Sequence, residues 1–433
     1  MRILSVLLLL AASGLHAQPR KDRHVVLISI DGLAAYALSD PQVPLPNLRR
    51  LALAGAVADS MEVVNPSVTW PNHTSMVTGV RPERHGMLYN GLPVRAEGRV
   101  TVEPWRPKTE LVLAPTVYDK AHEAGLTTAE VDWVAILNAP TITWSFPEVP
   151  RGNEPVVKEM VAAGLVTDEE IQAFRKGNII WRDEIWTRAG EHILRRHKPN
   201  LLLFHLLTTD SSQHRYGARS LAGNTALALA DARVGRLLDA LKQAGIDERT
   251  TVIVTSDHGF KTYAETLQPN AFLRSKGISD VWVVPEGGTG MVYITRPERK
   301  SELLPVLRRE LGSMAGVQRV IGEDEFTKLG YPLPGKNDRM ADLVLSARDG
   351  FAFGGNAEGP SSVRSPEGST PGAHGYLNTD ADMDGVLIIS GAGVRSGVRL
   401  GRTRTIDIAP TVAHLLGLRL DGVDGKVLRE ALR

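Results

Sequence analysis

Four short apolar runs constrain the fold of this chain more than any other feature of its sequence. These runs span residues 24–30, 201–207, 251–255 and 386–389. Unbroken apolar runs of this length are typical of strands that are buried on both faces of a parallel sheet. Helical patterns lie between them, the clearest from 225 to 244, where Gly245 provides a stop. Strands that alternate with helices predict an α/β fold with a mostly parallel central sheet and helices on both faces.

Two stretches interrupt this alternation. Residues 134–198 combine proline, tryptophan and mixed charge without a clear strand or helix pattern. Residues 286–355 indicate short strands and one helix, 300–312. We interpret both stretches as small lid-like insertions in one catalytic domain that covers residues 22–433.

The N-terminal segment predicts export. Arg2 precedes an apolar run, 3–12, and the residues up to Ala17 fit a cleavage point, so residues 1–17 are expected to be a signal peptide. The apolar run is about half as long as a membrane-spanning helix requires. We therefore expect a periplasmic or secreted protein whose mature chain does not span a membrane.

The composition excludes several classes of site and partner. The chain has no cysteine, so any transition metal must be held by histidine and carboxylate side chains. Its formal net charge is +1, which gives no indication of a nucleic-acid-binding surface. A small molecule is the expected partner, and the sequence leaves the oligomeric state open.

Potential metal ligands follow three of the predicted strands. They are Asp31 after the first strand, Asp210 and His214 after the second, and Asp257 and His258 after the third. A further histidine, His374, stands between small residues late in the chain. Taken alone, an aspartate after a strand is better explained as a helix cap or turn residue. Because the carboxyl ends of parallel strands meet at one edge of a sheet, however, we expect these side chains to converge.

The types of these six residues favour zinc. Imidazole and carboxylate groups suit this metal, and a catalytic zinc has three protein ligands and an open position. Six ligands make two such sites, and a pair of ions about 4 Å apart clamps the attacking and leaving oxygens of a phosphoryl group. The sequence therefore predicts two Zn²⁺ ions as cofactors.

Thr69 is the candidate nucleophile. It stands in the string Asn65-Pro-Ser-Val-Thr-Trp-Pro-Asn-His73, at the expected start of a helix. A hydroxyl at a helix N-terminus faces backbone N–H groups that bind an anionic phosphate. Coordination to zinc also makes its proton easier to lose. The alternative is a plain helix N-cap.

These motifs carry a resemblance to a known family. The string Thr69-Trp-Pro-Asn-His73 resembles the nucleophile region of type I phosphodiesterases and nucleotide pyrophosphatases, which belong to the alkaline phosphatase superfamily. The remaining metal motifs of that family have similar counterparts here in the same order: Asp31-Gly32, Asp210-Ser-Ser-Gln-His214, Ser256-Asp-His-Gly259 and His374-Gly-Tyr376. The likeness extends over about residues 24–430. It implies an alkaline-phosphatase-like fold.

The resemblance also implies a role for each candidate residue. One zinc would be completed by the nucleophile Thr69 and held by Asp31, Asp257 and His258. The second zinc would activate the water that hydrolyses a phospho-threonine intermediate, and its ligands would be Asp210, His214 and His374. Asn90 stands where the family has an amide that binds a phosphate oxygen, although Asn90-Gly91 is also a favoured hairpin turn.

Two departures from the family pattern bear on the substrate. Many nucleotide-acting relatives have Glu-Glu-Pro where this chain has residues 207–209, and an aromatic residue at the position of His205. In those relatives the aromatic residue and the residue after the nucleophile, here Trp70, hold a base between them. Trp70 and His205 are therefore expected to bind substrate, although core packing accounts for Trp70 equally well.

The sequence predicts a zinc-dependent hydrolase of phosphoric diesters or nucleotide pyrophosphate bonds that works through a covalent phospho-threonine. The alternative is a phosphomonoesterase or phosphonate hydrolase of the same superfamily, but no arginine or third cation site is evident near Thr69. A phospho-group transferase is less favoured because such proteins usually carry several membrane helices. An inactive metal-binding protein is less favoured because an inactive relative is expected to lack a metal ligand or the nucleophile, and this chain has all of them.

Overall fold

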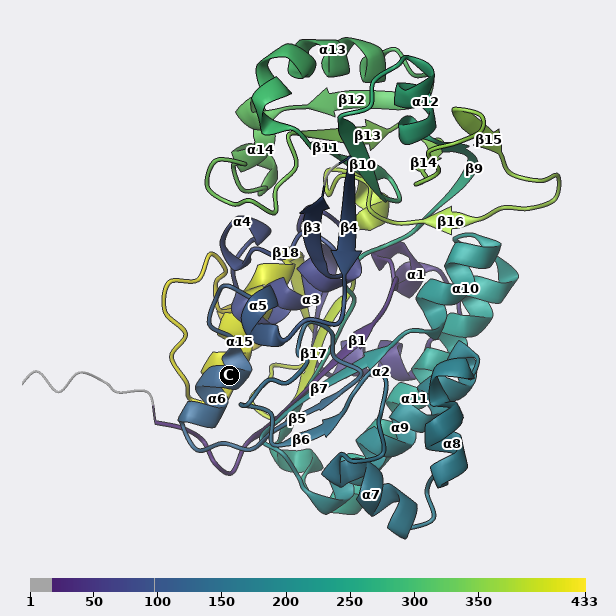
Figure 1. Cartoon of the computed structure of the whole chain (residues 1–433). Helices are drawn as coiled ribbons and strands as arrows, with labels where there is room; N and C mark the ends of the chain where they lie inside the picture. The colour runs from purple at the N-terminus through teal and green to yellow at the C-terminus, as the bar shows by residue number, and fades with distance from the viewer. Residues whose placement is uncertain (1–17, 97) are drawn as a thin grey trace, which may run out of the picture.

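An eight-stranded sheet lies at the centre of the computed structural model, which describes residues 18–96 and 98–433 (Figure 1). The predicted signal peptide, residues 1–17, lies outside the described residues. In spatial order the strands are β18 (Val398–Arg404), β2 (Ala56–Glu62), β17 (Leu387–Gly391), β8 (Thr250–Thr255), β1 (His24–Ile30), β7 (Leu201–Leu206), β5 (Thr128–Val131) and β6 (Trp144–Phe146).

The sheet is mostly parallel, as predicted. Only the pairs that β17 makes with β2 and β8 are antiparallel. The strands predicted at 24–30, 201–207 and 251–255 agree with β1, β7 and β8 to within one residue. The strand predicted at 386–389 is β17, which ends two residues later and runs against its neighbours. An apolar run indicates that a strand is buried, but it carries no information on the direction of that strand.

Alternate residues of β1 enter two different cores, which explains why the whole strand is apolar. Val26 and Ile28 belong to one core, and Val25 and Leu27 belong to the other. The first core is covered by α2 (Pro46–Ala54), α7 (Pro155–Ala162), α8 (Asp168–Ala173), α9 (Ile179–Arg196) and α11 (Leu221–Ala244), and the second by α3 (Thr69–Thr78), α6 (Val117–Glu123) and α15 (Ile408–Leu415). Across residues 18–96 and 98–433, no helix has the length and apolar character needed to cross a membrane.

The segment 134–198, expected to be an insertion, contributes to the central layers themselves. Strand β6 extends the sheet beside β5, and α9 packs against α11. Asp183, buried on α9, accepts hydrogen bonds from the backbone N–H groups of Leu207 (3.0 Å) and Thr208 (3.1 Å). These groups begin α10 (Thr208–Tyr216), the helix that carries Asp210 and His214. Helix α9 therefore helps to position two of the predicted ligands.

A second, smaller unit lies at one end of the central sheet (Figure 1). Its main sheet is antiparallel and has the order β10 (Val281–Glu286), β11 (Thr289–Ile294), β13 (Leu343–Ala347), β12 (Val317–Ile321). Three helices accompany it: α12 (Pro269–Ser275), α13 (Lys300–Gly312) and α14 (Glu323–Leu329). Most of the segment predicted as 286–355 falls in this unit, and α13 has the bounds of the helix expected there.

The remaining elements are short, and one pair of them bears on the site. They are β3 (Leu92–Ala96), β4 (Arg99–Glu103), β9 (Lys261–Leu267), β14 (Gly350–Phe353), β15 (Ser362–Arg364), β16 (Gly372–Ala373), α1 (Ala35–Ser39), α4 (Pro82–His85) and α5 (Lys108–Leu111). Strand β9 starts just after His258, and β16 ends just before His374. Because β16 pairs with β9, the two histidines are brought together.

Glycines follow these two histidines because the backbone is crowded there. A Cβ atom on Gly259 would lie 1.9 Å from the carbonyl oxygen of Asp382. A Cβ atom on Gly375 would lie 1.7 Å from the carbonyl oxygen of Glu286, and Gly375 also has a φ of +78°. Both clashes are with backbone atoms, which cannot rotate away as a side chain can.

We predict that Gly259→Ala lowers the free energy of unfolding by about 1–3 kcal/mol, because the loop after β8 must shift to admit the methyl group. Denaturant unfolding of the purified variant measures this change. Gly335→Ala is the matched control, since a Cβ atom there meets nothing within 4 Å. Equal stability of the two variants would contradict the prediction.

Candidate functional site

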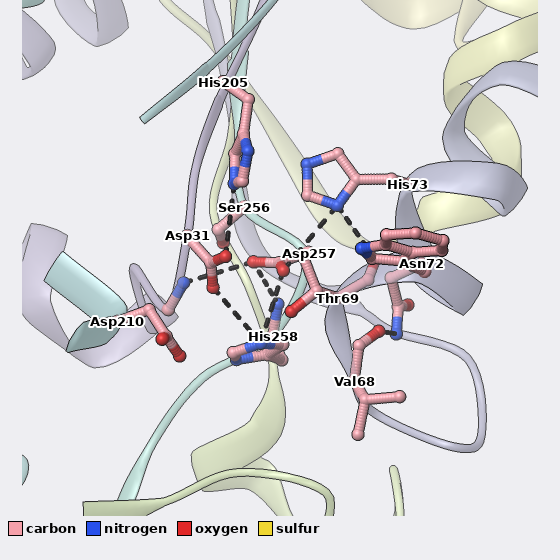
Figure 2. Close-up of polar contacts among 12 residues, drawn as sticks. Asp31, Val68, Thr69, Asn72, His73, His205, Asp210, Ser256, Asp257 and His258 are labelled. Carbon is pink, nitrogen blue, oxygen red and sulfur yellow. Dashed lines mark hydrogen bonds and ion pairs between the residues drawn. The ribbon is translucent and has the colours of Figure 1, made fainter. Parts of the chain in front are cut away.

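The predicted ligands meet at one edge of the central sheet, and Figure 2 shows four of them, Asp31, Asp210, Asp257 and His258. Strands β8, β1 and β7 are neighbours and run parallel, so their carboxyl ends lie side by side. Asp31 follows β1, and Asp257 and His258 follow β8. Helix α10, which follows β7, carries Asp210 and His214. The convergence expected from the sequence is therefore what the fold produces.

One group of ligand atoms is centred on Asp210. Its Oδ1 atom lies 3.2 Å from Nε2 of His214 and 3.7 Å from Nε2 of His374. The potential ligand atoms of these three residues all lie within 4.8 Å of one another. This is the set predicted for the second zinc.

A second group is centred on His258. Its Nε2 atom lies 3.3 Å from Oδ1 of Asp31 and 3.3 Å from Oδ2 of Asp257. Asp31 and His258 also form a group within 4.8 Å together with Asp210. The two groups are therefore adjacent, and Asp210 lies between them.

Unpartnered polar atoms test whether this edge fits a metal. Among the described residues, four buried atoms of the predicted ligands have no hydrogen-bond partner: Oδ1 of Asp31, Oδ1 of Asp210, Oδ2 of Asp257 and Nε2 of His258. A buried polar atom without a partner is costly, and each such atom in a folded protein needs an explanation. All four are atoms that coordinate zinc in proteins, and they face one another. The donor set fits a metal centre.

Backbone carbonyl groups fix the three histidine rings. The Nδ1 atoms of His214, His258 and His374 lie 3.0 Å, 3.1 Å and 3.2 Å from the carbonyl oxygens of Gly372, Gly259 and Ser67, respectively. Because a carbonyl oxygen only accepts hydrogen bonds, Nδ1 is the donor in each ring, and Nε2 is the nitrogen that offers a lone pair when the ring is neutral. This arrangement is typical of histidines that bind a metal through Nε2.

The electrostatics of the site also favour bound cations. Burial, together with Asp257 and Asp210, raises the pKa of the Asp31 carboxyl well above its usual range. Burial opposes the ionisation of Asp210, but the nearby His214 outweighs it and lowers this pKa to about 2. Burial and the neighbouring His258 and His214 lower the pKa of His374, which keeps its imidazole neutral. Crowded carboxylates beside neutral imidazoles are stable when a positive ion lies among them.

Thr69 is the first residue of α3 and is 7% exposed. Figure 2 shows its hydroxyl pointing toward Asp257 and His258. The loop before it is held by Asn72, whose side chain accepts a hydrogen bond from the N–H of Val64 (2.8 Å) and donates one to the carbonyl of Val68 (3.0 Å). His73 donates from Nδ1 to the carbonyl of Thr69 itself (2.9 Å). The Asn-His pair in the nucleophile string therefore braces the backbone of Thr69.

Asn90 reaches the same helix terminus. Its side-chain oxygen accepts a hydrogen bond from the backbone N–H of Trp70 (2.9 Å), the second residue of α3. This contact orients the amide, because its oxygen is engaged and its NH₂ group remains as the donor.

His205 does not lie where a substrate ring would stack. It is 1% exposed, and Nε2 lies 3.2 Å from Oδ2 of Asp31 (Figure 2). Nδ1 lies 3.2 Å from Oδ2 of Asp132. Burial opposes the charged form, but the two carboxyl groups raise the pKa of His205 well above its usual range. The structure therefore corrects the substrate-binding role expected for His205, because both of its ring nitrogens face carboxyl groups behind the metal-ligand candidates.

A cavity of about 400 Å³ adjoins Trp70 instead. Its walls include two further tryptophans, Trp105 and Trp133. Trp70 is 8% exposed and also belongs to a small apolar cluster with Met87 and Leu111. Trp70 therefore packs in the core and also presents an edge to a cavity. No motif marks Trp105 or Trp133, because neither belongs to the strings around the ligands.

Known proteins resemble this chain in sequence. A family model for type I phosphodiesterase / nucleotide pyrophosphatase matches residues 25–377. A pyrophosphatase/phosphodiesterase of Schizosaccharomyces pombe is 25% identical over 406 residues, which are 91% of this chain and 77% of the relative. Ectonucleotide pyrophosphatase/phosphodiesterase family member 1 of Homo sapiens is 28% identical over 241 residues, covering 54% of this chain and 23% of the relative. The match to venom phosphodiesterase of Macrovipera lebetinus likewise covers only 25% of that protein.

The fold is shared with solved structures. Murine ectonucleotide pyrophosphatase / phosphodiesterase 5 superposes with a TM-score of 0.74 at 19% identity, covering 95% of this chain and 100% of that chain. An inactive threonine-to-alanine form of the murine protein, solved in complex with AMP, superposes equally well. The ordered motifs, the shared fold and the match over residues 25–377 show that the chain belongs to the type I phosphodiesterase / nucleotide pyrophosphatase family.

Proposed function

We propose that this protein hydrolyses phosphoric diesters or nucleotide pyrophosphate bonds, with two zinc ions as cofactors and Thr69 as the nucleophile. The observation that carries the proposal is the set of four unpartnered ligand atoms that face one another beside the N-terminus of α3. A helix N-terminus favours an anionic group, and the ligand set favours cations. A phosphoryl group would fit between the N-terminus of α3 and the cations.

The ligands divide between the ions as follows. Asp31, Asp257 and His258 would hold the first zinc together with Thr69. Asp210, His214 and His374 would hold the second. When bound, the ions supply positive charge that stabilises the phosphoryl oxygens and makes a hydroxyl or water proton easier to lose.

The reaction would proceed through two successive displacements at phosphorus. The Thr69 oxygen attacks phosphorus, the P–O bond to the first alcohol or phosphate group breaks, and that group leaves with the electron pair and takes up a proton. Water then attacks the phospho-threonine, which releases a phosphate monoester and restores the Thr69 hydroxyl. Asn90 donates from its NH₂ group to a phosphoryl oxygen throughout, because Trp70 fixes its orientation.

Two observations favour a diester over a monoester. The cavity beside Trp70 has room and aromatic walls for an organic group attached to the phosphate. Within the part of the chain that the structure describes, the ion pairs of Asp31, Asp210 and Asp257 are all with histidines. A monoester carries an additional negative charge, for which an arginine or further cation would be expected. The AMP complex of the murine relative supports a nucleotide as one candidate substrate.

We also propose that the protein is exported. The N-terminal pattern of residues 1–17 favours a signal peptide. Venom phosphodiesterases and ectonucleotide pyrophosphatases among the relatives support a location outside the cytoplasm.

We predict that Thr69→Ala lowers kcat by about 10³-fold or more, because the attacking oxygen is removed. Hydrolysis of an aryl nucleotide diester measures the loss, and elemental analysis of the same sample measures zinc. Zinc content is expected to equal that of the wild-type protein, since six of the seven proposed active-site ligands remain. Full activity of the variant, or no metal in the wild-type protein, would refute the mechanism. Thr78→Ala, in the last turn of the same helix, is the control for a lost buried threonine.

The diester preference predicts a kcat/KM that is about tenfold or more higher on an aryl nucleotide diester than on the matching aryl phosphate monoester. The reason is that only the diester places an organic group in the Trp70 cavity while avoiding a second negative charge at the site. Paired initial-rate measurements with the same leaving group test this. The reverse preference would establish the monoesterase alternative.

We predict that His205→Ala weakens zinc binding by about 10–100-fold, because Asp31 loses the ring that orients its carboxylate. Competition with a chromophoric chelator measures the affinity without depending on activity. The control is His24→Gln, which removes a buried histidine from the opposite end of the same strand as Asp31. Unchanged zinc affinity in His205→Ala would show that the ring only fills space.

A further inference from the structure

A second cluster of metal-ligating side chains lies away from the candidate active site. It consists of Glu159 on α7, His192 on α9 and His197 just after α9. The Oε2 atom of Glu159 lies 2.9 Å from Nε2 of His192 and 2.7 Å from Nε2 of His197. Both rings therefore turn the same nitrogen toward one carboxylate oxygen.

The cluster is separate from the catalytic edge of the sheet. His192 lies roughly 14 Å along α9 from Asp183, the residue that positions α10. His197 comes shortly before β7 begins, so it lies at the amino end of that strand, whereas the catalytic candidates lie at the carboxyl ends. The proposed function does not use any of these three residues.

The geometry matches a tetrahedral zinc with one open position. Two imidazoles and one carboxylate are a ligand set that zinc uses in proteins, and neighbouring ligand atoms around such an ion lie about 3.3 Å apart. The three ligand atoms here lie within 4.8 Å of one another, and the two shortest separations need to widen by only about 0.5 Å. The side chains are 32%, 13% and 9% exposed for Glu159, His192 and His197, so a fourth ligand from solvent has access on the carboxylate side.

The surroundings hold the rings in place. Trp144, the first residue of β6, stacks on His197 with ring centroids 3.6 Å apart and an angle of 17° between the planes. His192 is fixed within the last turns of α9. Both histidines are therefore held on the central layers, and only Glu159 comes from a separate helix.

We propose that Glu159, His192 and His197 form a third zinc site, which fastens α7 to α9. An ion bound by Glu159 fixes the position of α7 against α9. The site is structural, and it is independent of whether Thr69 acts as the nucleophile.

Zinc stoichiometry tests this proposal. Wild-type protein and the variant Glu159→Gln are equilibrated with buffered Zn²⁺, separated from unbound ion and analysed for metal. The variant is expected to hold one zinc ion fewer than the wild type, while its activity on an aryl diester changes by less than about twofold. The amide introduced by Glu159→Gln still offers a carbonyl oxygen to both rings, so the variant keeps a hydrogen-bonded contact between the helices. The exposed His122, on α6, provides the control variant His122→Asn, which is expected to bind as much zinc as the wild type.

A second measurement removes the catalytic ions from the comparison. In an Asp31→Asn, Asp210→Asn background, which removes a carboxylate from each proposed catalytic site, added Zn²⁺ is expected to raise the Tm, and this rise is expected to be lost when His197→Asn is added. Equal zinc content in wild type and Glu159→Gln would overturn the proposal and leave a hydrogen-bonded contact between the two helices. A Tm rise that survives His197→Asn would overturn it as well.

Discussion

The rest of the structure depends on three carboxylates that share one edge of the sheet, of which Asp31 and Asp257 are fully buried and Asp210 is partly exposed. Asp31, Asp210 and Asp257 are brought together by the pairing of β1 with β7 and β8, and their mutual repulsion must be offset within a space from which water is largely excluded. Neighbouring histidines offset part of this repulsion, and the carboxylate oxygens without a hydrogen-bond partner indicate where a cation would offset the rest. The local backbone is arranged around this requirement, with glycines where the loops approach one another most closely.

Backbone carbonyl groups and a few buried side chains hold the candidate metal ligands in position. Three carbonyl oxygens, each from a loop or short strand, set the tautomers of the ligand histidines. Behind Asp31, His205 bridges to Asp132, and behind α10 the carboxylate of Asp183 caps the helix start. Ser67 and Gly259 belong to the motif strings, but Asp132 and Asp183 come from segments without a recognisable motif. Part of the precision of the site therefore rests on residues that a motif search does not find.

The sequence predicts the catalytic edge better than it predicts the substrate side. Asp31, Asp257 and His258 follow apolar runs whose burial is easy to recognise, and parallel strands leave little choice about where their ends meet. The sequence does not place His205, because a position five residues before a ligand does not determine which way the side chain turns from β7. Trp133 was missed because it belongs to an irregular loop, where no periodicity relates sequence to orientation. The segment 134–198 was interpreted as an insertion because charged residues on the solvent side of α9 obscure its apolar face.

The order of the ligands along the chain has a consequence for folding. Asp31 precedes nearly all of the sheet, whereas His374 comes after the smaller unit is complete, so the site has no local nucleus of contacts. Long-range pairing of this kind slows folding, because loops must close before the contacts that stabilise them exist. No fragment shorter than residues 31–374 contains the full set of candidate ligands. Binding of the proposed catalytic ions is therefore coupled to nearly the whole fold, so that these ions would stabilise the finished molecule against unfolding as a unit.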